Sequence, residues 1–286
     1  MTYLNLGCGS RYHHDWINID IVSTDPHVRA HDLTRGIPLP DDSCEVVYHS
    51  HLLEHLRRPD AVRFMKECQR VLQPGGTLRV AVPDLERICR VYIEKLEAAL
   101  ADDQTAPEDY DWMLLELYDQ TVREESGGQM RAYLLRDGIP NERFVYERIG
   151  EEGRAIIESF RHPSNADGAL AKRRPSLMTA LRYRIATLWR RLNEQMARLW
   201  LGQRGADALR LGRFRLSGEA HQWMYDRFSL ARLMVAAGFV ETQQQKATTS
   251  RIPDWPSFNL DTTPDGFLVK PDSLFMEATK TARTRT

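Results

Sequence analysis

Apolar residues near the start of the chain form two short runs that a glycine-containing turn separates. Residues 3–6 form the first run, residues 7–9 read Gly-Cys-Gly, and the second run, residues 16–19, ends on Asp20. Short apolar or alternating runs predict strands, and closely spaced glycines predict a turn between them. This part of the chain therefore predicts a strand, a glycine turn, a second strand and an acidic residue at its tip.

Strand-like and helix-like segments continue to alternate as far as residue 95. Residues 45–48 predict a strand, residues 59–72 an amphipathic helix, and residues 77–82 a strand that follows a Pro-Gly-Gly turn. Strands that alternate with helices in this way predict a parallel sheet.

The same patterning returns near the C-terminus. Residues 229–237 predict a helix that Gly238 caps, and further strands are predicted from Phe239 onward and over residues 273–278. The domain with a parallel sheet that begins the chain is therefore expected to close at its C-terminal end.

A long segment between these two parts is not needed for a minimal domain of this kind. Its first half is rich in acidic residues and its second half is rich in arginine, so the two halves are expected to carry opposite charge. The predicted organisation is residues 1–94 as the N-terminal part of the core, 95–217 as a helical insertion, 218–280 as the C-terminal part of the core and 281–286 as a disordered tail.

The basic half of the insertion contains an apolar stripe at helical spacing. Pro175-Ser176 predicts the start of this long helix and Gly202 its end, with arginines and tryptophans on its flanks. We interpret it as a helix packed on its own domain or on a dimer mate. The alternative is that residues 176–201 lie on an anionic membrane surface. The stripe consists of Leu177, Leu181, Ile185, Leu188, Leu192, Met196 and Leu199.

Composition limits the classes of protein to which the chain can belong. Its 286 residues are 42% hydrophobic and 28% charged, enough for one large core and an appendage. The sequence shows neither a signal peptide nor a membrane span, and its four cysteines lack C-x-x-C spacing, so we expect a cytoplasmic protein with reduced thiols. A net charge of −1 gives no electrostatic reason to expect nucleic acid as a partner.

The glycine turn suits a cofactor that carries a ribose, because an acid at the tip of the next strand can accept hydrogen bonds from both ribose hydroxyls. A dinucleotide fingerprint requires a third glycine and an acid about 20 residues further on. Tyr12 stands in place of that third glycine, and Asp20 follows Gly9 by eleven residues. The turn therefore disfavours NAD.

Four motifs in order carry a resemblance to a known family: LNLGCG, INID, HDLTRGIPLPDDSCEVVYHSHLLEHL and RVLQPGGTLRVAVPD. They resemble class I S-adenosylmethionine-dependent methyltransferases of the small-molecule type, over residues 3–90 and more faintly over 218–280. The resemblance implies an α/β fold, with a Rossmann-like, mostly parallel sheet flanked by helices and a large helical insertion after the fifth strand. It also implies S-adenosylmethionine as the cofactor.

The resemblance assigns cofactor-binding positions residue by residue. Asp20 is expected to hold the ribose diol, and Asp32 and Leu33 to lie beside adenine. The backbone of residues 49–51 is expected to face the sulfonium. Between turn and second strand there are only nine residues, 10–18, too few and too polar for the family's usual first helix. The full expected set is Leu6, Gly7, Cys8, Gly9, Asp20, Asp32, Leu33, His49, Ser50 and His51.

Histidines and an acid close to the fourth strand also raise the question of a metal. The arrangement is H-x-H-x-x-E-H, over His49, His51, Glu54 and His55, and it lacks the spacing of H-E-x-x-H zinc sites. The family resemblance accounts for it without a metal. We therefore expect no metal, and we interpret His55 as a structural histidine that caps a helix.

Transfer of a methyl group to a hydroxyl requires a base that removes the proton. His221, on the segment that leads into the last helix, is the predicted base, with Asp84 after the fifth strand as its alternative.

The predicted function is O-methylation of a sugar, a glycan or another small polar acceptor. The HQWMYD segment is similar to segments of family members associated with glycan biosynthesis. One alternative is a scaffold that binds the cofactor without turnover. Another is nucleic-acid methylation, which only the basic helix supports. The sequence lacks the N-P-P-[YF] motif that methylation of base amines often uses. Expected partners are a small-molecule or glycan acceptor, a membrane surface through residues 176–201, or a second copy of the chain.

Overall fold

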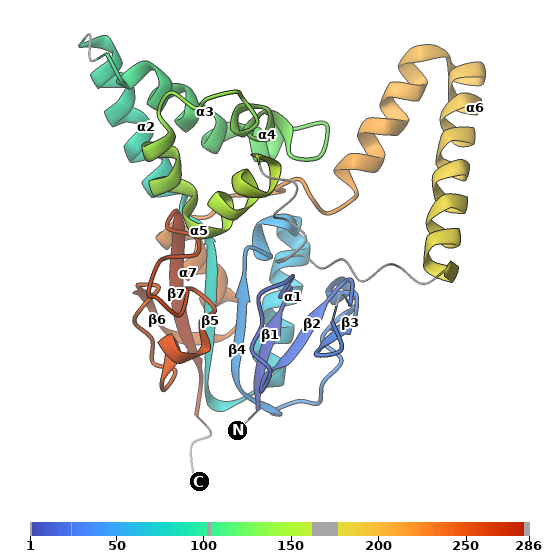
Figure 1. Ribbon diagram of the computed structural model, residues 1–286. Helices are drawn as coiled ribbons and strands as arrows, with labels where there is room; N and C mark the ends of the chain where they lie inside the picture. The colour runs from blue at the N-terminus through green and yellow to red at the C-terminus, as the bar shows by residue number, and fades with distance from the viewer. Residues whose placement is uncertain (1, 24, 102–103, 162–176, 283–286) are drawn as a thin grey trace.

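The computed structural model describes residues 2–23, 25–101, 104–161 and 177–282. Its centre is a seven-stranded sheet with the strand order β3-β2-β1-β4-β5-β7-β6 (Figure 1), in which only β7 runs antiparallel to its neighbours. This confirms the predicted fold class. The strands are β1 (Tyr3–Leu6), β2 (Ile17–Asp20), β3 (Val28–Ala30), β4 (Cys44–Ser50), β5 (Leu72–Pro83), β6 (Phe239–Gln245) and β7 (Ser273–Lys280).

Most elements lie where the hydrophobic pattern predicts them, and the differences have local causes. Strand β3 was not predicted, because three residues are too few to show a period. The predicted turn before the fifth strand is part of β5, which begins at Leu72 and changes register against β4 between Cys44 and Val46. The helices are α1 (Arg58–Val71), α2 (Leu85–Leu100), α3 (Ala106–Val122), α4 (Gly128–Leu134), α5 (Glu142–Arg161), α6 (Leu177–Arg215) and α7 (Arg227–Ala236).

Helices α1 and α7 cover one face of the sheet. Their apolar residues, such as Phe64 and Leu230, join alternate residues of the strands, such as Leu4 and Leu78, in one buried cluster. Burial of this apolar surface is the main stabilising contribution to the core.

An aromatic cluster covers part of the opposite face, around Trp16, Tyr48 and Trp255. Residues 246–272 supply much of it and are attached to the sheet by the fully buried Arg79, which forms ion pairs with Asp261 at 2.8 Å and with Glu277 at 2.8 Å. Residues 10–16 contain no helix, as predicted, and Trp16 fills the space beside β1 instead.

Helices α2 to α5 lie above the carboxyl ends of the parallel strands (Figure 1). They have an apolar cluster of their own around Trp112 and Tyr133. A buried ion pair joins α5 to α3, with Arg148 Nε donating to Glu116 Oε1 at 3.0 Å. The predicted insertion thus begins as a separate helical layer over the end of the sheet where the site is expected.

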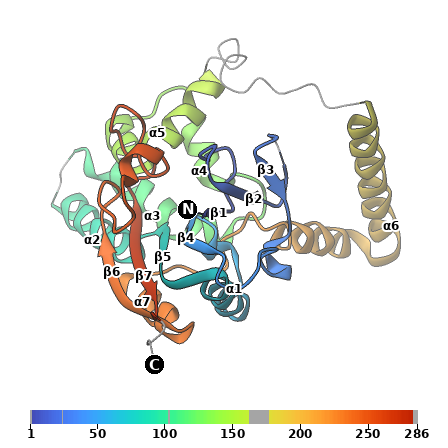
Figure 2. The same cartoon turned by 90° about the horizontal axis from the view of Figure 1, so that it is seen from below.

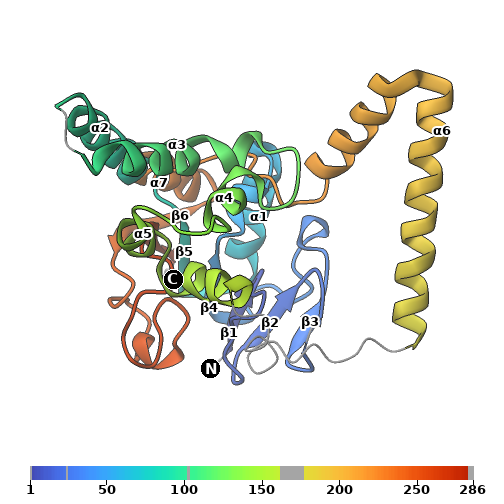
Figure 3. The ribbon, with the colours of Figure 1, turned by 45° about the horizontal axis from the view of Figure 1, so that its top comes forward.

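Helix α6 extends away from the rest of the molecule as a bent arm (Figures 2 and 3). The bend is at Gly202, whose φ of +70° confirms the predicted end of the first helix. The predicted start at Pro175-Ser176 lies outside the described residues.

The prediction that the stripe packs on its own domain is wrong for its described members. Leu188, Leu192, Met196 and Leu199 are between 42% and 78% exposed, because the helix leaves the core instead of lying on it. Among the described residues, no helix combines the length and the apolar character that a membrane crossing requires.

Candidate functional site

The glycine turn after β1 has a backbone shape that non-glycine residues rarely adopt. Gly7 has a φ of +63° and Gly9 a φ of +54°. A Cβ on Gly7 would lie 2.9 Å from Leu52 Cδ1, whereas a Cβ on Gly9 would meet nothing within 4 Å. Gly7 thus allows the turn to pack against the segment after β4, and Gly9 leaves open space on the other side.

Asp20 lies at the tip of β2, directly beside this turn. Its Oδ2 accepts a hydrogen bond from the Gly9 N–H at 2.8 Å, and its Oδ1 accepts from the Val22 N–H at 3.3 Å. A carboxylate has about four acceptor positions, so about two remain free on this half-exposed side chain. Asp20 can therefore hold the turn and still accept two hydroxyl donors.

Asp32 follows β3 and begins the short helix Leu33–Arg35. Its Oδ1 accepts from the backbone N–H of Thr34 at 3.0 Å and from its hydroxyl at 2.6 Å. These hydrogen bonds lower the pKa of Asp32, so the carboxylate is charged at neutral pH. Asp32 and Leu33 are both partly exposed, as a position beside a bound base requires.

A cleft begins at the glycine turn and passes between β4 and the segment before β7. Its volume is about 180 Å³, which is below the range of about 300–1,000 Å³ typical of sites for drug-sized ligands. Of the residues predicted from the sequence, Gly7, Cys8, Gly9, Ser50 and His51 line it. Leu6 lies in the core behind the turn.

Other walls come from residues for which the sequence patterns predict no role. Asp261 and Lys270 belong to residues 246–272, and Glu152 reaches the cleft because α5 breaks at Gly150, whose φ is +65°. Lys270 Nζ lies 3.0 Å from Glu152 Oε2. These residues have no local motif, and only the tertiary fold brings them to the glycine turn.

His51 connects the cleft with a buried group behind it. Its Nε2 is hydrogen-bonded to Ser273 Oγ at 2.8 Å, and its Nδ1 lies 3.4 Å from Glu54 Oε1. Burial, followed by the charges of Lys270 and His221, holds the pKa of His51 well below its usual value. His51 is therefore a neutral imidazole at the edge of the cleft.

His49 has a different environment although it is only two residues away. Its side chain points into the core against Phe64, with 5.2 Å between ring centroids, and neither ring nitrogen has a hydrogen-bond partner among the residues that the structure describes. Burial lowers the pKa of His49 to about 3. Only the backbone of His49 lies at the expected position on β4.

The two predicted bases do not line the cleft. Asp84 begins α2 and accepts a hydrogen bond from the Arg87 N–H at 3.1 Å, while burial raises its pKa. His221 is held by its backbone N–H, which donates to Gln120 O at 2.9 Å, and burial lowers the pKa of its ring to about 3. Their roles as bases remain predictions.

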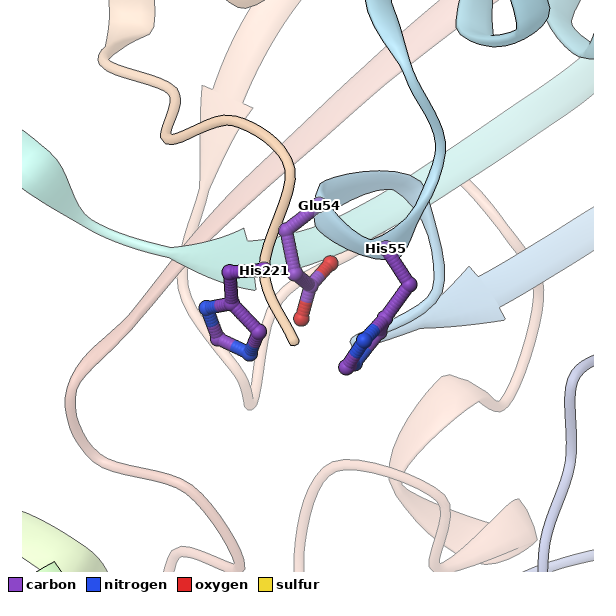
Figure 4. A group of neighbouring side chains, drawn as sticks. All are labelled: Glu54, His55 and His221. Carbon is purple, nitrogen blue, oxygen red and sulfur yellow. The ribbon is translucent and has the colours of Figure 1, made fainter. Parts of the chain in front are cut away.

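His221 instead joins Glu54 and His55 (Figure 4). The three side chains each offer one ligand atom, and these atoms all lie within 4.8 Å of one another. Glu54 is fully buried, and within the described part of the chain neither of its carboxyl oxygens has a hydrogen-bond partner. Burial raises the pKa of Glu54 to about 8, so the carboxyl is protonated at neutral pH in the absence of a bound cation.

Residues 4–80 match the family model described as a methyltransferase domain. A Mycolicibacterium smegmatis protein named "Probable S-adenosylmethionine-dependent methyltransferase" is 37% identical over 99 residues, which are 28% of this chain and 37% of that protein. A Mycobacterium tuberculosis protein of the same description is 35% identical over 98 residues, 28% of this chain and 35% of that protein. The chain thus spans little more than a third of the length of these relatives.

A solved S-adenosylmethionine-dependent methyltransferase from Mesorhizobium loti is 13% identical, with a TM-score of 0.34, over 98% of this chain and 90% of that one. The sequence match covers the glycine turn and the end of β4, which line the cleft, and also Asp20 and Asp32, which do not line it. The sequence match and the sheet topology therefore indicate a class I S-adenosylmethionine-dependent methyltransferase fold, and the similarity over residues 4–80 implies S-adenosylmethionine as the cofactor.

Proposed function

We propose that the chain transfers a methyl group from S-adenosylmethionine to an oxygen atom of a small polar acceptor, with a sugar or glycan as the expected class. The observation that carries this proposal is the character of the cleft, which leads from the glycine turn between polar and charged walls. Such walls offer donors and acceptors to a hydroxyl-rich molecule. They include Arg11, Glu152, Asp261, Lys270 and Ser273.

The cofactor would supply an electrophilic methyl group on a positively charged sulfur. Asp20 would hold the ribose with the acceptor positions that its bonds to the turn leave free. Asp32 and Leu33 would contact adenine, and the turn with its open space at Gly9 would lie along the methionine end.

The acceptor hydroxyl must lose its proton, and His51 is the group that we place in this role. Its neutral imidazole lines the cleft and is oriented by Ser273. His221 lies behind it, close enough for the charge of one ring to disfavour protonation of the other. Asp84, which caps α2, would serve the fold.

Formation of S-adenosylhomocysteine in the presence of candidate acceptors tests the proposal. The purified chain is incubated with S-adenosylmethionine and a panel of sugars, sugar nucleotides, phenols and amines. We expect turnover with at least one hydroxylated acceptor, strongly reduced in His51→Ala and retained in Asp137→Ala, a control at an exposed position. Turnover with amines alone would contradict oxygen as the accepting atom.

A second candidate function is that of a scaffold that binds the cofactor without turnover. The observation in its favour is that neither Asp84 nor His221 lines the cleft. In that case calorimetry would detect S-adenosylmethionine binding, and no acceptor of the panel would yield S-adenosylhomocysteine.

We also propose that the arm formed by α6 contacts an anionic membrane surface. Its exposed apolar residues include Trp189 and Trp200, at 62% and 79% exposed, next to arginines of a basic segment. Tryptophan and arginine on an amphipathic helix favour the headgroup region of a membrane. The alternative is that a second copy of the chain binds the same face. Vesicle binding distinguishes the two.

A further inference from the structure

The side chain of Glu54 lies in an environment that leaves its carboxyl group without a hydrogen bond. It is fully buried, and both oxygens lack a partner among the described residues. His51 Nδ1 lies 3.4 Å from Oε1, which is longer than a good hydrogen bond. Buried polar groups without partners are costly and rare, so this one needs an explanation.

Two imidazoles face the same place from different parts of the chain. His55 ends the short helix Leu53–His55 after β4, and His221 lies on the segment that leads to α7 (Figure 4). Their ring centroids are 4.7 Å apart at an interplanar angle of 89°. His55 Nδ1 is buried, and no described residue is its hydrogen-bond partner.

Backbone hydrogen bonds fix these two segments against each other. The N–H groups of Gln222 and Trp223 both donate to Glu54 O, at 2.7 and 3.2 Å, and the His221 N–H donates to Gln120 O at 2.9 Å. The three side chains therefore converge because the main chain holds them, independently of any attraction among the side chains themselves.

We propose that Glu54, His55 and His221 bind a divalent transition-metal ion, for which zinc is the best match. One carboxylate oxygen and two imidazole nitrogens are a donor set that zinc uses in proteins. With bonds of about 2.0–2.1 Å, tetrahedral donors lie about 3.4 Å apart. The donors here are within 4.8 Å of one another, so rotation of the side chains can bring them to that spacing.

The ion would fasten the segment before α7 to the end of β4. Three protein ligands leave a fourth position for water or another donor. His51, in contact with Glu54, lines the cleft, so the site would lie directly behind the cleft wall. This inference does not rest on the proposed methyl transfer.

The sequence motif H-x-H-x-x-E-H predicted no metal, because it contains only residues 49–55. The geometry selects a different set, in which His221 replaces His49 and His51. His49 lies on the other side of β4 against Phe64, and His51 is engaged by Ser273.

Equilibrium dialysis of the chelator-treated full-length chain against Zn²⁺, followed by elemental analysis, tests the site. We expect one equivalent in the parent and in His31→Ala, a histidine outside the cluster. Loss of even a neighbour of a ligand lowers metal affinity about 10- to 100-fold. We therefore expect Glu54→Gln and His221→Ala each to lower the zinc affinity by at least about tenfold.

Absence of zinc from the parent, or unchanged zinc affinity in both folded variants, would overturn the inference. If the variants do not fold, X-ray absorption of the zinc-loaded parent decides the matter. A shell of nitrogen and oxygen with two imidazoles supports the site, and sulfur from any of the four free cysteines contradicts it. Asp20→Ala should keep its zinc even though it binds S-adenosylmethionine poorly, so failure of one proposal is distinguishable from failure of the other.

Discussion

The sheet core and the α6 arm use the same apolar residue types in opposite ways. Leu78 of β5 is fully buried between sheet and helices, whereas Leu199 of the arm is 78% exposed. Between the two halves of the arm lie polar residues, and Arg213 Nη1 is 3.6 Å from Glu194 Oε1. The core thus has apolar residues inside and the arm has them outside, which indicates that the core is stabilised by burial and that the arm presents a surface.

The largest effect that separates the two regions is expected from a matched pair of leucine substitutions. Leu78→Ala should lower the free energy of unfolding by about 2–5 kcal/mol, because it leaves a cavity in the core. Leu199→Ala should change it by less than about 0.5 kcal/mol, because the side chain is already exposed. Denaturant unfolding measures both. Equal losses in the two variants would show that the arm packs on the molecule in solution.

A smaller effect on the free energy of unfolding is expected from His49 in the core, and this effect depends on pH. Because burial lowers the pKa of His49 from 6.5 to about 3, only the unfolded chain takes up this proton between those values. His49 therefore makes the protein less stable as the pH falls below 6.5, by about 2 kcal/mol at pH 5.

His49→Leu removes this titration, so its stability relative to the parent should rise by about that amount between pH 7.5 and pH 5. Denaturant unfolding at the two pH values measures the change. A constant difference between variant and parent would mean that a hydrogen-bond acceptor or water reaches the His49 ring in solution and keeps its pKa near 6.5.

The smallest effect is expected at the arm. If the arm contacts an anionic membrane, the parent should sediment with anionic vesicles and dissociate as salt rises. Each arginine near such a surface contributes about 1 kcal/mol. Arg191→Gln combined with Arg198→Gln should therefore weaken vesicle binding by up to about 2 kcal/mol, roughly 30-fold. A dimer in solution that ignores vesicles would assign the apolar face to a second copy of the chain.

Local patterns predicted the core better than the arm, for a physical reason. The apolar runs predict strands β1, β2 and β4, and the closely spaced glycines predict the turn, whose two glycines have positive φ. Both signals are local in the sequence. The apolar stripe of α6 shows that the helix has an apolar face, but a period cannot say what covers that face. For that reason the part of the prediction that packed the stripe on its own domain is wrong, whereas packing on a dimer mate stays a prediction.

The candidate site divides in the same way. Gly7, Gly9 and Asp20 could be found because they are close in sequence and follow a family pattern. Asp261 and Lys270 could not, because residues 246–272 reach the cleft through the long-range ion pair of Arg79 with Asp261. His221 was singled out from the sequence as a base, but its neighbours Glu54 and His55 became visible only in three dimensions.

The central claim is that the glycine turn and Asp20 bind S-adenosylmethionine, and isothermal titration calorimetry tests it most directly. Hydrogen bonds to a charged group contribute about 1.5–3 kcal/mol each, so Asp20→Ala should lower the affinity at least about tenfold. Leu199→Ala, on the arm, should bind the cofactor as the parent does. Unchanged affinity in a folded Asp20→Ala protein would contradict the claim and remove Asp20 from the site.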